Sequence, residues 1–304
     1  MISYLQAIVI GLLQGVTELF PVSSLGHSVL VPALLGWDGV LRDQSAQESP
    51  YLAFLVGLHV ATALALLVFF RAEWARIVRG LVRSLRRRRV ETPDERLGWL
   101  LVVATIPAGL VGLAFEHALR TLFAKPLAAA VFLTVNGLVL LAGERLRRRP
   151  RAEVRWSGGP GADELALAPS PVRTEPARLL ATLTVPEALL IGSAQILAFF
   201  AGISRSGVTM VAGLLRGLDH EDAARFSFLL ATPIILAAGV YKLPDLLGPN
   251  GDGVRGQVLA GSLVAAVAAY LSVRFLTRWF TTRTLTPFAI YCLVVGVACI
   301  VRFA

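Results

Sequence analysis

The sequence predicts an all-α integral membrane protein, built as an inverted-topology repeat with six transmembrane helices and two re-entrant helical hairpins. The first observation is composition: 56% of the 304 residues are hydrophobic and only 16% are charged, with a mean hydropathy of +0.69. Such values are typical of polytopic membrane proteins. The second is a duplicated apolar segment that contains polar groups, and the third is an uneven distribution of arginine along the chain.

Six apolar runs have the character of simple spans. They are 51–70, 97–119, 126–143, 226–241, 257–276 and 285–304. Two further runs, 1–35 and 186–216, are interrupted by glycine, proline and polar residues, which predicts hairpins rather than continuous spans. No cleavable signal peptide is expected, because the first basic residue is Arg42.

The two interrupted runs are copies of each other. With an offset of 181 positions, "AIVIGLLQGVTELFPVSSLGHS" (7–28) aligns without a gap to "ALLIGSAQILAFFAGISRSGVT" (188–209). Three spans follow each copy, which indicates an internal duplication. We therefore expect one membrane domain with a first repeat at 1–146, a cytoplasmic linker rich in proline, glycine and charge at 147–178, and a second repeat at 179–304.

Arginine predicts the orientation of the repeats. Nine arginines lie in the 71–96 loop, eight in 145–178 and three in 274–283, against five lysines and arginines in all the intervening loops. By the positive-inside rule these three loops are cytoplasmic. The first repeat then begins outside and the second inside, so the hairpins enter from opposite faces. The basic loops suit contact with membrane lipids, and no nucleic-acid-binding motif accompanies them.

The first hairpin places a carboxylate, Glu18, within apolar sequence. An ionised group at such depth is costly and indicates function; the alternative is a structural ion pair with an arginine elsewhere. Gln14 lies one helical turn earlier on the same face. Two oxygen-bearing side chains so placed suit a hard divalent cation, Mg²⁺ or Ca²⁺.

Three further polar residues follow Pro21 in the same hairpin. His27 lies beyond a turn from Glu18 and taken alone is equally a hydrogen-bonded core residue. Ser23 and Ser24 follow the proline, where hydroxyls often only cap a helix.

The second hairpin supplies a positive charge in "AGISRSGVT" (201–209). Glycines and hydroxyls surround Arg205, an arrangement that suits phosphate binding at a helix N-terminus. The alternative is a salt bridge from Arg205 to Glu18. The repeat would bring the serines of the first hairpin opposite this arginine, which gives the groups that phosphoryl transfer needs.

These motifs resemble those of the undecaprenyl pyrophosphate phosphatase family of the bacitracin-resistance type. The resemblance rests on "QGVTELFPVSSLGH" (14–27) and "GISRSGVT" (202–209), with support from "RFSFLLATP" (225–233) and "PFAIY" (287–291). It implies a multi-pass enzyme of the bacterial plasma membrane with an outward-facing site. Its substrate would be the C55 polyprenyl diphosphate, and its product the lipid carrier of peptidoglycan synthesis.

The resemblance also implies residue roles. Gln14 and Glu18 would lie near the metal, Ser24 and His27 would be catalytic, and Arg205 would bind the diphosphate. The remaining hydroxyls would contact substrate; these are Ser23, Ser204, Ser206 and Thr209. Whether Ser24 or His27 is the nucleophile stays open; the favoured pairing has Ser24 attack with His27 as its base.

A second class of function fits the same architecture. Inverted repeats with broken helices are common in transporters, so a polyprenyl-phosphate flippase is the alternative. A homodimer is compatible with the sequence. The other membrane phosphatase superfamily is disfavoured, because "SRSGVTMVAG" lacks a histidine where its "SRxxxxxHxxxD" motif needs one.

Overall fold

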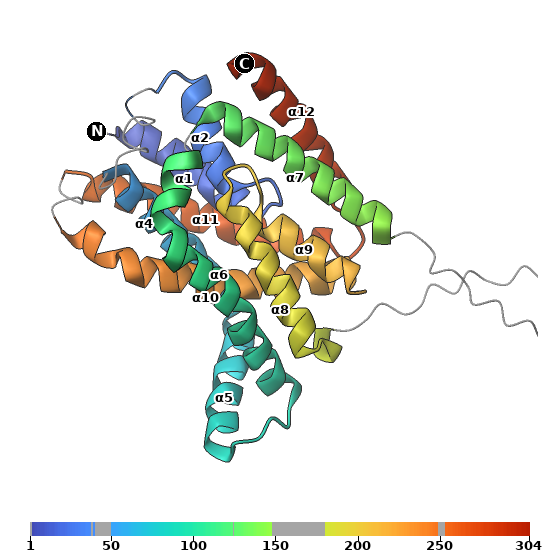
Figure 1. Ribbon diagram of the computed structural model, residues 1–304. Helices are drawn as coiled ribbons and strands as arrows, with labels where there is room; N and C mark the ends of the chain where they lie inside the picture. Colours follow the sequence, from blue (N-terminus) through green and yellow to red (C-terminus); the bar gives the residue numbers. More distant parts are fainter. Residues whose placement is uncertain (1, 38, 40–49, 124, 148–179, 249–252) are drawn as a thin grey trace, which may run out of the picture.

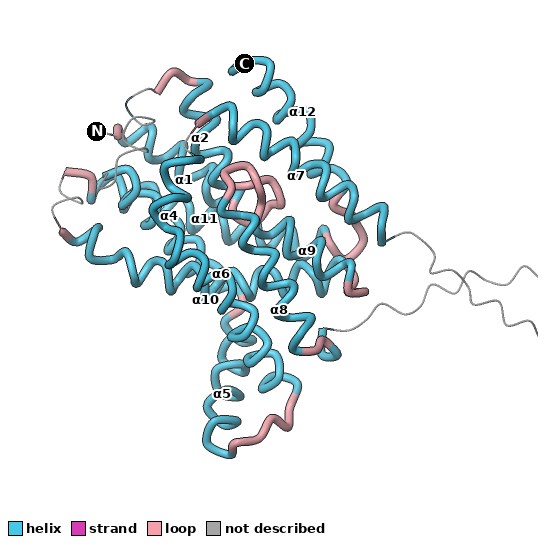
Figure 2. Tube along the Cα trace, in the orientation of Figure 1, coloured by secondary structure: helices cyan, strands magenta, loops and turns pink. Residues whose placement is uncertain are grey.

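The computed structural model describes residues 2–37, 39, 50–123, 125–147, 180–248 and 253–304 (Figure 1). All regular structure in these residues is helical (Figure 2). The helices are α1 (Tyr4–Thr17), α2 (Ser24–Leu34), α4 (Pro50–Phe69), α5 (Arg71–Arg87), α6 (Pro93–Phe123), α7 (Pro126–Arg147), α8 (Val185–Ala194), α9 (Arg205–Leu215), α10 (His220–Leu247), α11 (Arg255–Trp279) and α12 (Thr286–Phe303). Two short 3₁₀ segments add Leu180–Thr182 and Gln195–Phe199.

Five helices are long and apolar enough to cross a membrane, namely α6, α7, α10, α11 and α12. A sixth span exists if α4 and α5 are counted together, although they are bent by 87° at their junction. The chain is therefore a multi-pass membrane protein, as its composition predicts. The predicted 147–178 linker lies outside the described residues, except at Arg147.

The two predicted hairpins consist of short helices. Helix α1 has 14 residues, and α2 and α9 have 11 each. At 1.5 Å per residue, 14 residues extend about 21 Å, which is less than the roughly 30 Å hydrocarbon core. Helix α1 contacts α2, and α8 contacts α9, so each pair folds back on itself.

The helix starts repeat at the offset of 181 that the sequence predicts. Ser3 and Gln6 form a reciprocal capping box at α1. Thr184 and Glu187 form the equivalent box at α8. Both boxes satisfy backbone N–H groups that have no partner within the helix, so the same local device begins both copies.

A second pair of caps repeats in the same way at the returning helices. Ser23 Oγ accepts a hydrogen bond from the Gly26 N–H at 3.2 Å, and Ser204 Oγ accepts one from the Gly207 N–H at 3.2 Å. These four residues are paired by the sequence alignment. The agreement at both caps supports the duplication.

The first helix of each predicted hairpin packs against a helix of the other predicted repeat. Helix α1 lies along α11, and α8 lies along α6. Gly11 of α1 approaches the backbone of Gly261, while its counterpart Gly192 of α8 approaches the backbone of Ala104. A side chain at either glycine would collide with that backbone, so these positions set how closely the helices cross.

Segments that the arginine pattern places in the cytoplasm meet on one side of the molecule. Four polar contacts of 2.6–2.8 Å join them: Arg96 to the Leu183 carbonyl, the Leu180 N–H to Asp222, the Leu285 N–H to Glu144, and Arg225 to Glu73. Helix α5 projects from the helical bundle with the start of α6 (Figure 1). Loops from both repeats therefore share one face.

Candidate active site

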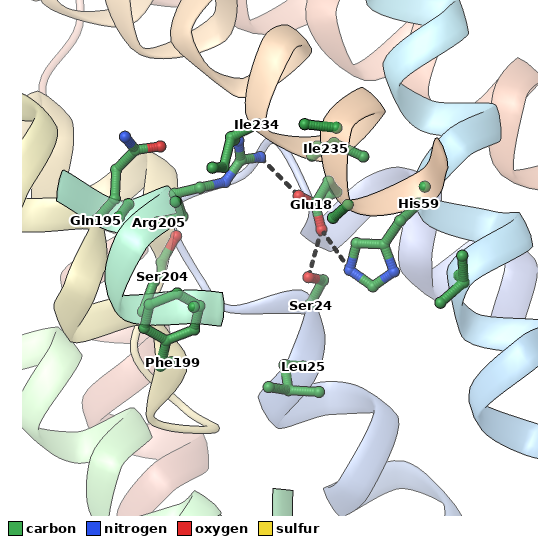
Figure 3. Close-up of a pocket in the computed structure, with 18 of the residues that line it drawn as sticks. Glu18, Ser24, Leu25, His59, Gln195, Phe199, Ser204, Arg205, Ile234 and Ile235 are labelled. Carbon is green, nitrogen blue, oxygen red and sulfur yellow. Dashed lines mark hydrogen bonds and ion pairs between the residues drawn. The ribbon is translucent and has the colours of Figure 1, made fainter. Parts of the chain in front are cut away.

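A cavity of about 600 Å³ lies where the hairpins meet α4, α6 and α10. Most of its lining is aliphatic or aromatic. Its polar lining residues are Thr17, Glu18, Ser23, Ser24, His59, Gln195, Ser204 and Arg205. Several of them gather around Glu18 (Figure 3). A cavity with a polar patch and apolar walls suits a ligand with a charged head and a hydrocarbon chain.

Glu18 is the centre of the polar patch. It follows the last residue of α1 and is 6% exposed. Its Oε1 accepts a hydrogen bond from Arg205 Nη2 at 2.6 Å, and its Oε2 accepts one from Gln14 Nε2 at 2.9 Å. The ion pair that the sequence left as an alternative is present. It lies in the cavity wall, so the pair is also accessible to a ligand.

Ser24 donates a hydrogen bond from Oγ to Glu18 Oε2 at 2.5 Å. The residue before it, Ser23, has φ +71°, a left-handed conformation that is uncommon for a residue with a side chain. The Gly202 N–H donates to Ser23 Oγ at 3.1 Å, so the second hairpin supports this turn. The strained turn directs the Ser24 hydroxyl at the carboxylate.

Asn136 of α7 bonds to the turn after α1 and to the turn before α9. Its Nδ2 donates to the Pro21 carbonyl at 3.0 Å, and its Oδ1 accepts from the Ser204 N–H at 2.9 Å. Asn136 is fully buried. One amide thus joins both hairpin turns, and it fixes Ser24 relative to Arg205.

His27 lies elsewhere than expected. Its Nδ1 is 2.7 Å from the Ser23 carbonyl oxygen, and its Nε2 is 2.8 Å from the Tyr291 hydroxyl. Both ring nitrogens therefore have partners, and His27 does not line the cavity. The structure does not bring His27 to Ser24, because the first turn of α2 directs the imidazole toward α12.

The histidine beside the carboxylate is His59 of α4. Its Nε2 is 3.5 Å from Glu18 Oε2, and its Nδ1 is 2.8 Å from the Leu55 carbonyl oxygen. Sequence reasoning missed it. A signal was present, because a titratable side chain within an apolar span is expected to face the protein interior or a polar cavity.

The hydroxyls of α9 divide into two groups. Ser204 lines the cavity. Ser206 instead contacts Ser204 Oγ at 3.0 Å, and Thr209 contacts Ser227 Oγ at 2.6 Å. The helical rotation turns Ser206 and Thr209 toward packed neighbours, so the structure places neither in the cavity wall.

The polar patch contains few ligands for a cation. In the described part of the chain, no three residues among His, Cys, Asp and Glu form a group that could hold a metal. Glu18 and the amide of Gln14 supply oxygen atoms, and Mg²⁺ commonly needs only one or two carboxylates when phosphate oxygens complete its shell. Glu18 lines the cavity whereas Gln14 does not, and a cation held there together with a phosphate group stays a prediction.

Comparison with known proteins identifies the family of this chain. The model of the family "Bacitracin resistance protein BacA" matches residues 7–298. The chain is 59% identical over 338 aligned positions to undecaprenyl-diphosphatase 2 of Frankia alni. It is 61% identical over 308 positions to the undecaprenyl-diphosphatases of Mycolicibacterium paratuberculosis and Mycobacterium avium. Each alignment covers 100% of this chain and 98% of the relative. The chain therefore belongs to the BacA family of bacitracin resistance proteins.

Proposed function

We propose that this protein is an undecaprenyl-diphosphatase, which hydrolyses C55 polyprenyl diphosphate to the monophosphate and inorganic phosphate. The product is the lipid carrier of peptidoglycan synthesis, and its regeneration accounts for bacitracin resistance. The observation that supports this most is the Ser24–Glu18–Arg205 cluster in the wall of a largely apolar cavity. The names of full-length relatives at about 60% identity support the same activity.

The cluster suggests how the phosphoanhydride is cleaved. Ser24 Oγ attacks the terminal phosphorus while Glu18 Oε2, at 2.5 Å, accepts its proton. The bond from phosphorus to the bridging oxygen breaks, and undecaprenyl phosphate leaves. Arg205 stabilises the negative charge on the phosphoryl oxygens. Water then cleaves the phosphoserine, and the proton on Glu18 returns to Ser24.

The histidines take different roles in this scheme from those that the sequence favoured. The base for Ser24 is Glu18, because His27 is bound to Ser23 and Tyr291. His27 positions the turn that holds Ser24. His59 adjoins the Glu18 oxygen that receives the proton, where its imidazole stabilises the carboxylate.

Glu18 and Gln14 would hold a divalent cation, Mg²⁺ or Ca²⁺, together with the diphosphate. When bound, such an ion supplies positive charge that makes the terminal phosphorus more electrophilic. Ser23 and Ser204 line the cavity beside this group and would contact the diphosphate head.

The predicted orientation of the repeats indicates which side of the membrane the cavity faces. The cavity extends to Leu113 of α6 and Tyr241 of α10, which lie toward the ends of these helices that the arginine asymmetry places outside. Two re-entrant hairpins and six spans in inverted repeats would therefore present the diphosphate site to the outer face of the bacterial plasma membrane. Apolar walls between α6 and α10 would admit the prenyl chain from the lipid.

A direct assay tests this function against a flippase role. Purified protein in detergent is mixed with C55, C15 and dialkyl diphosphates, with and without EDTA, and phosphate release is measured. A phosphatase releases phosphate without a second compartment, and EDTA lowers the rate. A pure transporter with this inverted-repeat fold would release none.

A further inference from the structure

Two buried polar atoms in the cavity wall have no partner within the part of the chain that the structure describes. They are Nη1 of Arg205 and Oε1 of Gln195. The first is a donor and the second is an acceptor. Both residues line the same cavity, and Figure 3 shows them as neighbours on one side of it. Buried polar atoms are rarely left unpaired, so each one needs an explanation.

The orientation of the Gln195 amide is fixed by its surroundings. Its Nε2 lies 3.3 Å from the Gly192 carbonyl oxygen and 3.5 Å from the Ala104 carbonyl oxygen. Both neighbours are acceptors, so the nitrogen must face them and the oxygen must face away. Gln195 is only 3% exposed. Its oxygen is therefore a buried acceptor that faces away from both carbonyl groups.

The internal repeat explains why the amide nitrogen of Gln195 faces backbone carbonyl groups. Gln14, the counterpart of Gln195, donates its amide hydrogen to Glu18 at 2.9 Å. The position equivalent to Glu18 in the second repeat is Phe199. The second hairpin therefore contains the glutamine without its carboxylate. Its amide nitrogen contacts backbone carbonyl oxygens instead, and its oxygen points away from them.

We propose that Gln195 Oε1 and Arg205 Nη1 together hold the water molecule that hydrolyses the phosphorylated enzyme. Water can accept a hydrogen bond from the guanidinium and donate one to the amide at the same time. An amide that orients attacking water is an established arrangement in phosphoryl transfer. Gln195 is thus a water-positioning residue, and this role rests on the proposed phosphatase function.

Hydrolysis of the phosphorylated Ser24 consumes one water molecule and restores the serine hydroxyl. The water oxygen forms a bond to phosphorus, and the bond from phosphorus to Ser24 Oγ breaks. The proton that Glu18 took during the first step returns to Oγ. Both water hydrogens leave on the product, which is dihydrogen phosphate. Gln195 directs one hydrogen away from phosphorus, so that a lone pair of the water oxygen faces it.

The test replaces Gln195 with methionine, which has nearly the same length but no strong acceptor. We expect Gln195→Met to lower kcat by about tenfold to a hundredfold, as loss of one positioning hydrogen bond implies. Because the amide acts only after the phosphoserine has formed, KM should fall together with kcat as that intermediate accumulates, and kcat/KM should stay within about twofold of wild type. Thr105→Val is the control. It removes a hydroxyl bonded within α6 next to Ala104, and its kcat should match the wild type.

Three outcomes would overturn the proposal. One is a kcat for Gln195→Met within threefold of wild type. Another is a rise of KM and of the phosphate inhibition constant in step with the fall in kcat, which would assign Gln195 to phosphate binding. The third comes from an experimental structure of the wild type that resolves water, where density between Arg205 Nη1 and Gln195 Oε1 is expected and its absence would count against us. Wild-type protein without phosphate release would instead refute the phosphatase function itself.

Discussion

The two terminal nitrogens of the Arg205 guanidinium have different surroundings. Nη2 binds Glu18 Oε1 at 2.6 Å, while Nη1 has no partner among the described residues. A lysine could keep the ion pair but has no second, fixed donor. We expect Arg205→Lys to lose about 2–4 kcal/mol of transition-state stabilisation, or roughly a hundredfold to a thousandfold in kcat. Steady-state phosphate release measures this fall in kcat. A kcat within threefold of wild type would mean that catalysis requires only the positive charge at position 205.

The distinction between Ser24 and His27 gives a second prediction. Ser24→Ala removes the attacking hydroxyl and should reduce phosphate release to background. His27→Asn should retain measurable turnover, because an amide can still donate to the Ser23 carbonyl, and it should instead lower the melting temperature in detergent. Equal loss of activity in both variants, with unchanged melting, would restore His27 to the chemistry.

Gln14 offers a test of the cation. Its Nε2 donates to Glu18 at 2.9 Å, so Gln14→Glu would place two carboxylates side by side. Like charges at this distance repel unless a cation separates them. We expect the half-saturating Mg²⁺ or Ca²⁺ concentration for phosphate release to fall. If the titration does not move, the cation does not bind beside Gln14.

For individual residues, the sequence predicted some members of the polar cluster and missed others. Glu18, Ser24 and Arg205 lie in two motifs within apolar sequence. Polar groups at such positions indicate function, because lipid excludes them. The partners of His27 and His59 could not be predicted, since they depend on contacts with α12 and with the first hairpin. Gln195 was visible only as a match to Gln14, and its free oxygen follows from a carbonyl on another helix.

Among the helices, glycine determines how closely each hairpin approaches the opposite repeat. A methyl group at Gly11 would meet the Gly261 backbone. Gly11→Ala should therefore separate α1 from α11 and destabilise the protein by about 1–3 kcal/mol. Gly109→Ala is the matched control, since its methyl group would meet only Ile234 Cδ1 at 3.9 Å and alanine favours a helix. Melting temperatures in detergent should fall for the first variant only.

The sequence predicted the long helices well, because continuous apolar runs mark them without any analysis of helical periodicity. Long apolar runs located five spans that the structure confirms. The two interrupted runs correspond to short helices, and their re-entrant arrangement in an inverted repeat stays a prediction. The 87° bend between α4 and α5 was not expected. It occurs where an apolar helix meets an arginine-rich one, and composition alone does not specify the angle between two helices.

For the whole molecule, the contacts among Arg96, Leu183, Glu144 and Leu285 support one shared cytoplasmic face. Single cysteines test this in a variant that lacks Cys292 and Cys299. In intact cells, an impermeant thiol reagent should label Ser45→Cys but label Ser157→Cys only after the membrane is opened. Strong labelling of Ser157→Cys in intact cells would contradict the topology and, with it, the inverted repeat.

The packing of α1 along α11 has a consequence for synthesis of the protein. Helix α1 leaves the ribosome first, yet it packs along α11, which ends at Trp279. Arg205 must also emerge before it can pair with Glu18. A nascent chain therefore has no working site until almost the last helix is inserted. Incomplete products should be inert toward the lipid carrier, and assembly in the membrane coincides with the onset of activity.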